Sequence, residues 1–176
     1  MDLKKLEVLL RAAANGYVDL CFFSLIRSGP FEYIDLVDDP MMVVLYPGHP
    51  LAKKRAIALE DLKDEPLLLA TNPRGLDYDV AKVLSEASFT PRIEATSNLD
   101  HIIFSMVQHH LGISIEAALM LTDKENAAVL RPFDPPQSRR LVMAARSFRT
   151  LSPAANQFVN HTKAALRKME PDRILF

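Results

Sequence analysis

The residues best suited to binding a ligand lie in one short segment, residues 71–76, with the sequence TNPRGL. It follows an apolar run typical of a strand and precedes an expected helix. In open α/β sheets, ligands bind at the carboxyl ends of strands, where helix N-termini offer N–H groups to anions. A hydroxyl, an amide, a guanidinium and a bare glycine backbone suit a carboxylate-bearing molecule. An ordinary solvent loop with a helix cap is the alternative interpretation. The residues assigned to the site are Thr71, Asn72, Arg74, Gly75 and Leu76.

A second polar segment, Thr96, Ser97 and Asn98, precedes another expected helix. Ser97 stands three residues before Asp100, a spacing that resembles a capping box. We expect at least one of the three side chains to cap the helix, because the first N–H groups of a helix have no partner within it. The other two are predicted to be weaker ligand contacts.

The sequence offers no pattern for catalysis or metal binding. His109 and His110 are adjacent on an expected helix, so their side chains diverge by about 100° and cannot readily share a metal ion. Cys21 is the single cysteine and lies in an expected strand, where it behaves as a small buried hydrophobe. The sequence has no Gly-rich phosphate loop, no G-x-S-x-G and no H-E-x-x-H. We therefore assign no catalytic residue, no metal ligand and no cofactor.

The composition is that of an ordinary globular domain, with 49% hydrophobic and 24% charged residues. The net charge of −1 gives no electrostatic reason to bind nucleic acid, and the basic cluster Lys53–Arg55 is expected to be a solvated turn. Every apolar run is shorter than the roughly 20 residues of a membrane helix. No signal peptide is visible, and a lone cysteine fits a reducing compartment, so we expect a cytoplasmic protein without membrane contact.

Apolar spacing and turn residues predict alternating strands and helices, and hence an α/β fold with mainly parallel sheets. Proline-rich joints near 38–40 and 135–138 are the expected crossings between two units. The expected helices span 2–15, 76–87, 99–111 and a segment that begins at Ser152-Pro153. The expected strands span 17–23, 41–46, 67–70, 92–95, 113–115, 128–133 and 141–145.

Several short motifs follow one another in an order that resembles the effector-binding region of LysR-type transcriptional regulators. They are GYVDL at 16–20, HPLA at 49–52, IALEDL and EPLLL between 57 and 69, FTPRI at 89–93 and LSPAA at 151–155. The stretch from Val107 to Ile115 is similar to the family's V-x-x-G-x-G-I, with His110 in place of a small residue. Where the family continues with proline, this chain has Ala117. The resemblance covers nearly the whole chain.

The resemblance implies a two-lobed, periplasmic-binding-protein-like (type 2) fold. One lobe would comprise residues 1–39 and 138–176, the other 40–137. A small effector would bind in the cleft between the lobes. The two polar segments described above would contact it from one lobe, and Ser24 would contact it from the other. The chain would be a non-enzymatic sensor that reaches DNA only through a domain absent from it. A solute-binding protein of a transport system is the alternative, although no signal peptide supports it.

The resemblance also implies that the chain opens at the second helix of the first lobe, which leaves that lobe incomplete. Strand 17–23 would then lie at a sheet edge, and it is apolar and carries no protective lysine or proline. We therefore expect a homo-oligomer that buries residues 17–23, or the adjoining helix 2–15, against another chain.

Overall fold

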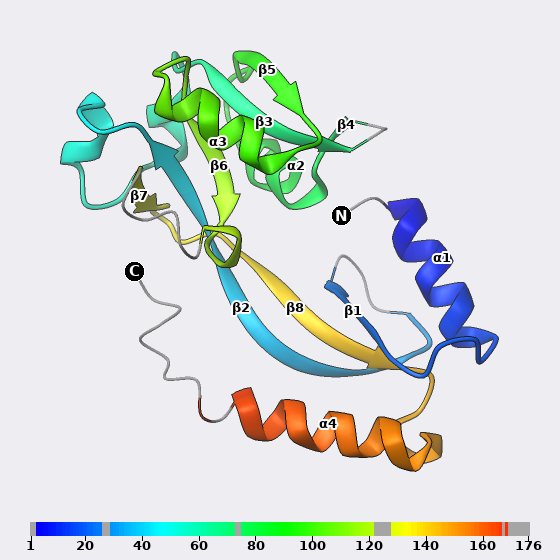
Figure 1. Cartoon of the computed structure of the whole chain (residues 1–176). Helices are drawn as coiled ribbons and strands as arrows, with labels where there is room; N and C mark the ends of the chain where they lie inside the picture. The colour runs from blue at the N-terminus through cyan, green and yellow to red at the C-terminus, as the bar shows by residue number, and fades with distance from the viewer. Residues whose placement is uncertain (1–2, 26–28, 73–74, 122–127, 167, 169–176) are drawn as a thin grey trace. The chain divides into compact units, whose positions relative to one another are not determined.

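The computed structural model describes residues 3–25, 29–72, 75–121, 128–166 and 168. These residues form two compact units, each described by itself below. The first comprises Leu3–Asp38 and the segment from Arg139 onward, and the second comprises Asp39–Ser138. The chain leaves the first unit within strand β2 (Glu32–Leu45) and returns at the start of β8 (Ser138–Ala145), as can be followed in Figure 1.

The first unit packs helix α1 (Leu3–Ala14) against β1 (Cys21–Ser24) and β8. Its core consists of Leu6, Ala13, Cys21, Phe23, Val142 and Ala144. The expected helix 2–15 is confirmed, and it ends where Gly16 adopts a φ of +75°, a conformation that favours glycine. β1 pairs with β8 antiparallel and lies at the end of its sheet's strand order.

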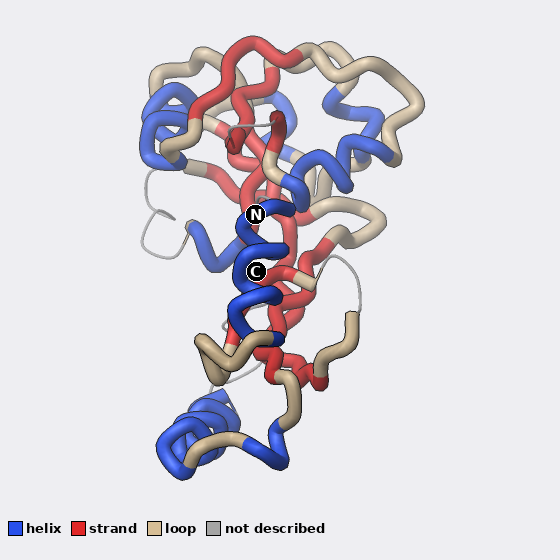
Figure 2. Tube along the Cα trace, turned by 90° about the vertical axis from the view of Figure 1, so that its right-hand side faces the viewer, coloured by secondary structure: helices blue, strands red, loops and turns tan. Residues whose placement is uncertain are grey.

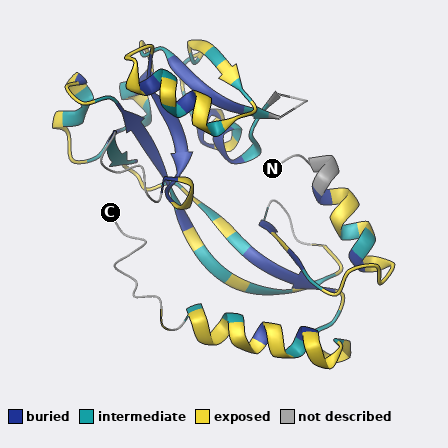
Figure 3. Ribbon diagram, viewed as in Figure 1, coloured by how far each residue is buried: buried dark blue, intermediate teal, exposed yellow. Residues whose placement is uncertain are grey.

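Helix α4 (Pro153–Leu166) also belongs to the first unit and begins as the sequence predicts. The Oγ of Ser152 accepts a hydrogen bond of 3.2 Å from the N–H of Ala155, and Pro153 occupies the first helical position. Phe158 meets Phe22 edge to face, with ring centroids 5.9 Å apart. Much of the helix surface is nevertheless exposed, as the yellow ribbon in Figure 3 shows.

The second unit buries both faces of residues 41–45 of β2. In β2, Met41, Val43 and Leu45 belong to one hydrophobic cluster, whereas Met42 and Val44 belong to another. Successive side chains of a strand point to opposite faces, so both faces of β2 are covered here. Helix α2 (Tyr78–Ser85) contributes to the first cluster and α3 (Asp100–Gln108) to the second. Figure 2 shows the strands of this unit between helical segments.

The pairing directions correct one expectation. β3 (Leu67–Asn72) pairs with β5 (Ile93–Ser97) in parallel, but β2 pairs antiparallel with both β6 (Ser114–Ala117) and β7 (Val129–Pro132). The α/β class is confirmed, and the prediction of mainly parallel sheets is wrong for these pairings. The reason is physical: a continuous apolar run reports burial of both faces and does not report strand direction.

One expected strand boundary is wrong, and one expected joint has a different local structure. The strand expected at 17–23 begins only at Cys21, and Tyr17 is 82% exposed. The chain does pass between the two units at the joint expected near 38–40, between Asp38 and Asp39, but β2 continues through Pro40 without a break. An edge or bulge position can tolerate proline within a strand, so the residue type alone did not mark a break.

Two backbone features hold α3 and β6 in place. Gly112 precedes β6, and a Cβ atom there would lie 2.4 Å from the carbonyl oxygen of Pro66. That carbonyl accepts a 3.0 Å hydrogen bond from the N–H of Ile113. His110 has a φ of +59°, which is unusual for a residue other than glycine, and its ring stacks on Tyr46 with centroids 4.2 Å apart.

Candidate ligand-binding site

The carboxyl ends of three strands lie along one edge of the second unit. β3 and β5 are parallel, with Leu69 opposite Thr96 and Ala70 opposite Ser97. A parallel bridge between Leu67 and Ile113 brings β6 alongside β3. Because carboxyl ends of parallel strands meet at the same edge, the residues that follow β3, β5 and β6 are neighbours. This is the edge at which ligands of open α/β sheets bind.

The segment expected as a loop at 71–76 is a tight hairpin. Thr71 pairs with Leu76, and Asn72 pairs with Gly75, so that Gly75–Leu76 forms strand β4. Thr71 and Leu76 are half-buried. The structure therefore brings Thr71 to the same edge as Ser97 and Asn98. Arg74 and Pro73 lie outside the described residues, so the predicted role of Arg74 stays a prediction.

The N-terminus of α2 is already occupied by acidic side chains. The Oδ1 of Asp77 accepts a 3.0 Å hydrogen bond from the N–H of Asp79, and Asp79 is itself buried in the first turn. Negative charge at this position complements the helix dipole and competes with any anionic ligand. An anionic ligand is therefore expected to bind other hydrogen-bond donors at this edge and not the N-terminus of α2.

The N-terminus of α3 differs from the expected capping box. Leu99 is the N-cap residue, and no side chain accepts a hydrogen bond from the helix there. Ser97 instead accepts a 3.1 Å bond from the N–H of Leu99, one residue before the helix. The expectation that Thr96, Ser97 or Asn98 caps α3 is thus wrong, because the Ser97 hydroxyl satisfies the turn that leads into the helix. Thr96 and Asn98 are exposed.

A small cavity lies between α3 and the even-numbered face of β6. Its volume is about 10 Å³, and its apolar wall includes Val44, Ile103 and Leu121. The polar residues that line it are Asp100, Ser114 and Glu116. Ser114 is fully buried, and its hydroxyl has no hydrogen-bond partner among the described residues. From the sequence, Asp100 was expected only as part of a capping box, and Ser114 and Glu116 were given no role. The sequence does contain a signal for a polar strand face here, because Ser114 and Glu116 alternate with the apolar Ile113 and Ile115.

Ser24 lies in the first unit, at the end of β1. It is 5% exposed and is paired with Leu141 of β8. Its predicted contact with an effector stays a prediction. Cys21, in the same strand, is buried as expected, and burial raises the pKa of its thiol. The thiol therefore stays protonated at neutral pH and has the character of a core side chain.

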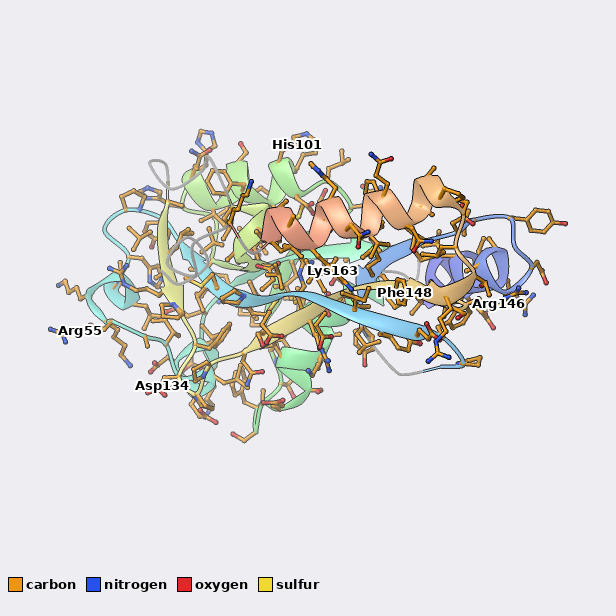
Figure 4. The ribbon with its side chains drawn as sticks, turned by 90° about the horizontal axis from the view of Figure 1, so that it is seen from below. Arg55, His101, Asp134, Arg146, Phe148 and Lys163 are labelled. Atoms are coloured by element: carbon orange, nitrogen blue, oxygen red, sulfur yellow. The ribbon has the colours of Figure 1, made fainter. Side chains whose placement is uncertain are left out.

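The remaining polar residues singled out in the sequence have structural or solvent-exposed positions. His49 shapes the turn before the short helix Pro50–Lys53, where its Nδ1 accepts a 3.2 Å bond from the N–H of Leu51. Its Nε2 lies 3.3 Å from Glu65. Arg55 points away from the ribbon in Figure 4, as expected of a solvated basic cluster. Within the described ranges, no group of three or more His, Cys, Asp or Glu side chains could hold a metal ion, and no helix is long and apolar enough to cross a membrane.

Comparisons with known proteins agree with this architecture. YwbI of Bacillus subtilis (strain 168), an uncharacterized HTH-type transcriptional regulator, is 30% identical over 138 residues, which cover 77% of this chain and 46% of that protein. The regulatory domain of Synechocystis PCC6803 CcmR in complex with 2-PG has a TM-score of 0.78 at 21% identity, and the match covers 93% of this chain and 80% of that one. The effector binding domain of QuiR in complex with shikimate has a TM-score of 0.73 at 23% identity, with coverages of 93% and 78%.

The chain spans about half the length of the curated relatives it matches. A model of one family, described as the LysR substrate binding domain, matches residues 2–167, which is nearly the whole chain. That family comprises ligand-binding domains of transcriptional regulators and not enzymes. The chain belongs to the LysR substrate binding domain family.

Proposed function

We propose that this chain is the effector-sensing part of a cytoplasmic LysR-type transcriptional regulator. The observation that carries the proposal is the shared carboxyl edge of β3 and β5, which collects Thr71, Ser97 and Asn98 in a chain of this family. Effector binding would shift the protein between two arrangements, and this requires a ligand that interacts differently with each. DNA would be reached through another part of the regulator.

The effector is proposed to be a small anionic metabolite. The hydroxyl, amide and guanidinium groups of segment 71–76 are suited to binding a carboxylate and so support an anionic effector. Two of the structures with a similar fold named above are complexes with 2-PG and with shikimate. The two compact units would be the two lobes of the domain, with boundaries near residues 39 and 138. A solute-binding protein of a transport system is the second candidate from the sequence, but the family match favours the regulator.

A thermal-shift screen of carboxylic acids tests the proposal, with shikimate and 2-PG as the first compounds. For an acid that stabilises the protein, Arg74→Ala should weaken binding by about 1.5–3 kcal/mol, the usual contribution of a hydrogen bond to a charged group. Arg55→Ala is the matched control, because it removes a guanidinium from an exposed turn of the same unit. Equal affinities of the two variants for that acid would remove Arg74 from the site.

The chain is also proposed to form a homo-oligomer through the first unit. β1 is the terminal strand of its sheet, and Tyr17, Val18 and Phe22 are 82%, 36% and 46% exposed. An exposed apolar edge strand is a template for pairing with another chain. On α1, Val8 is 66% exposed and offers an alternative surface.

Light scattering at micromolar concentration distinguishes the two surfaces. Phe22→Ser should shift the assembly toward the monomer if β1 is buried, whereas Val8→Ser should do so if α1 is buried. A wild-type protein that is monomeric throughout this range would show that the apolar edge is tolerated without a partner.

A further inference from the structure

The cavity beside β6 is unusual because polar side chains line a surface that the rest of the unit makes apolar. Ile115 and Ala117 of β6, and Ile113 just before it, belong to the α2-side cluster. Ser114 and Glu116 therefore face the α3 side, where Met42, Val44 and Ile103 form the core. A serine and a glutamate take positions where the adjoining residues are hydrophobic.

Ser114 requires a partner that the described residues do not supply. Its side chain is fully buried, and its hydroxyl lines the cavity without a hydrogen bond to any described group. A buried polar group that is left without a hydrogen bond destabilises the folded state, because it has lost its bonds to water. The cavity of about 10 Å³ has room for about one water-sized group next to this hydroxyl.

The chemistry of the lining selects the kind of group. The side-chain oxygens of Asp100 and Glu116 are acceptors when ionised, and the Ser114 hydroxyl can also accept. Apolar side chains complete the wall and strengthen electrostatic attraction by excluding water. The positive end of the α3 dipole, equivalent to about half an elementary charge, opposes a cation here, but two carboxylates carry more charge than that.

We propose that the cavity is a subsite for a primary ammonium group, formed by Asp100, Ser114 and Glu116 of the second unit. An –NH₃⁺ group has the size of a water molecule and three donors, which match the three acceptors of the lining. Met120, at the rim, is 42% exposed, so the rest of an amine can extend outward beside it. The inference rests on the proposed function in one respect: it makes the effector a molecule with both an anionic and an ammonium group.

The test uses amines alone, so that it does not depend on knowing the effector. Thermal unfolding is measured in ammonium chloride, methylammonium chloride and tetramethylammonium chloride at equal ionic strength. Ammonium and methylammonium should raise the unfolding temperature above the value in tetramethylammonium, which is larger and has no N–H donors. Ser114→Ala and Glu116→Gln should abolish that difference. Ser105→Ala, which changes an exposed serine of α3, should retain it.

A comparison of salts within each variant separates ligand binding from any change in the stability of the fold. Slowly exchanging proton signals of ¹⁵N-labelled ammonium in the wild type, absent from Ser114→Ala, would provide a second readout. Equal unfolding temperatures in the three salts would overturn the inference, since the cavity would then bind no ammonium group. If carboxylic acids still bind in that case, the proposed effector function stands. If ammonium binds and no acid does, the proposed function fails and the cation subsite remains.

Discussion

The two units differ in how completely they bury their strands. In the second unit, consecutive residues of β2 enter two separate hydrophobic clusters, and Val43, Val44 and Leu45 are fully buried. In the first unit, β1 alternates between buried Cys21 and Phe23 and the 46% exposed Phe22. The edge that carries the candidate site combines the two cases, because Leu67–Ala70 of β3 are buried, whereas the residues of β5 are exposed or half-buried.

The largest expected effect is a cavity in the doubly covered core. Leu68→Ala removes a fully buried side chain between β2 and α3 and should lower the free energy of unfolding by about 2–5 kcal/mol. Leu6→Ala, in the first unit, should cost less than Leu68→Ala, because the smaller cluster around α1 can relax toward solvent. Urea unfolding followed by circular dichroism measures both. A larger loss for Leu6→Ala would reverse the comparison between the units.

The second prediction tests how tightly β6 is held against β3. Gly112→Ala would place a Cβ atom 2.4 Å from the Pro66 carbonyl oxygen and 3.0 Å from Leu68 Cγ. Backbone must move, and the hydrogen bond from Ile113 to Pro66 would be strained, so we expect a loss of about 3 kcal/mol in the free energy of unfolding.

Gly48→Ala is the control for that measurement. Gly48 has a φ of +91° and no atom within 4 Å of the added Cβ, so only backbone strain of about 1–2 kcal/mol is expected. Equal losses in the free energy of unfolding for Gly112→Ala and Gly48→Ala would show that close packing at Gly112 contributes little to stability.

The sequence predicted those parts of the fold that depend on local periodicity. Helix 2–15 and the start of the last helix at Ser152-Pro153 were correct within a residue or two, because apolar spacing, a terminal glycine and a capping serine are all local signals. Strand direction was predicted wrongly for β2, because an apolar run such as Met41–Leu45 reports burial on both faces and is the same for parallel and antiparallel pairing. The start of β1 was also missed, because Tyr17 and Val18 are apolar residues on an exposed surface.

The ligand-binding role of the candidate site stays a prediction, whereas the structure shows how its residues are arranged. Thr71 and Ser97, both assigned to the site from the sequence, lie at one sheet edge because β3 and β5 are parallel. The hydrogen bond of Ser97 to Leu99 could not be predicted from the spacing to Asp100, since the same serine can satisfy either a turn or a cap. The complete burial of Ser114 could not be predicted either, because it depends on which face of β6 packs against α3, and this is decided by tertiary structure.

The smallest expected effect concerns an exposed ion pair of the first unit, between Asp35 of β2 and Arg140 of β8, two strands that are neighbours in the sheet. Arg140 donates two hydrogen bonds to the carboxylate of Asp35, one of them 2.7 Å long, and these hold the pKa of that carboxyl below its usual value. A lowered pKa in the folded state means that the pair stabilises the fold above about pH 4, the pKa of an unfolded aspartate. This stabilisation is lost as pH falls through the folded pKa.

The urea midpoint of Asp35→Asn should therefore lie slightly below that of the wild type at pH 7 and converge with it in acid. Asp38→Asn, which removes a carboxylate that acts on Arg140 only through its charge, should change the midpoint less. The gap should also narrow at high salt, because both side chains are more than half exposed. A gap that persists unchanged at pH 3 would show that the Asp35 side chain stabilises β2 through something other than its charge.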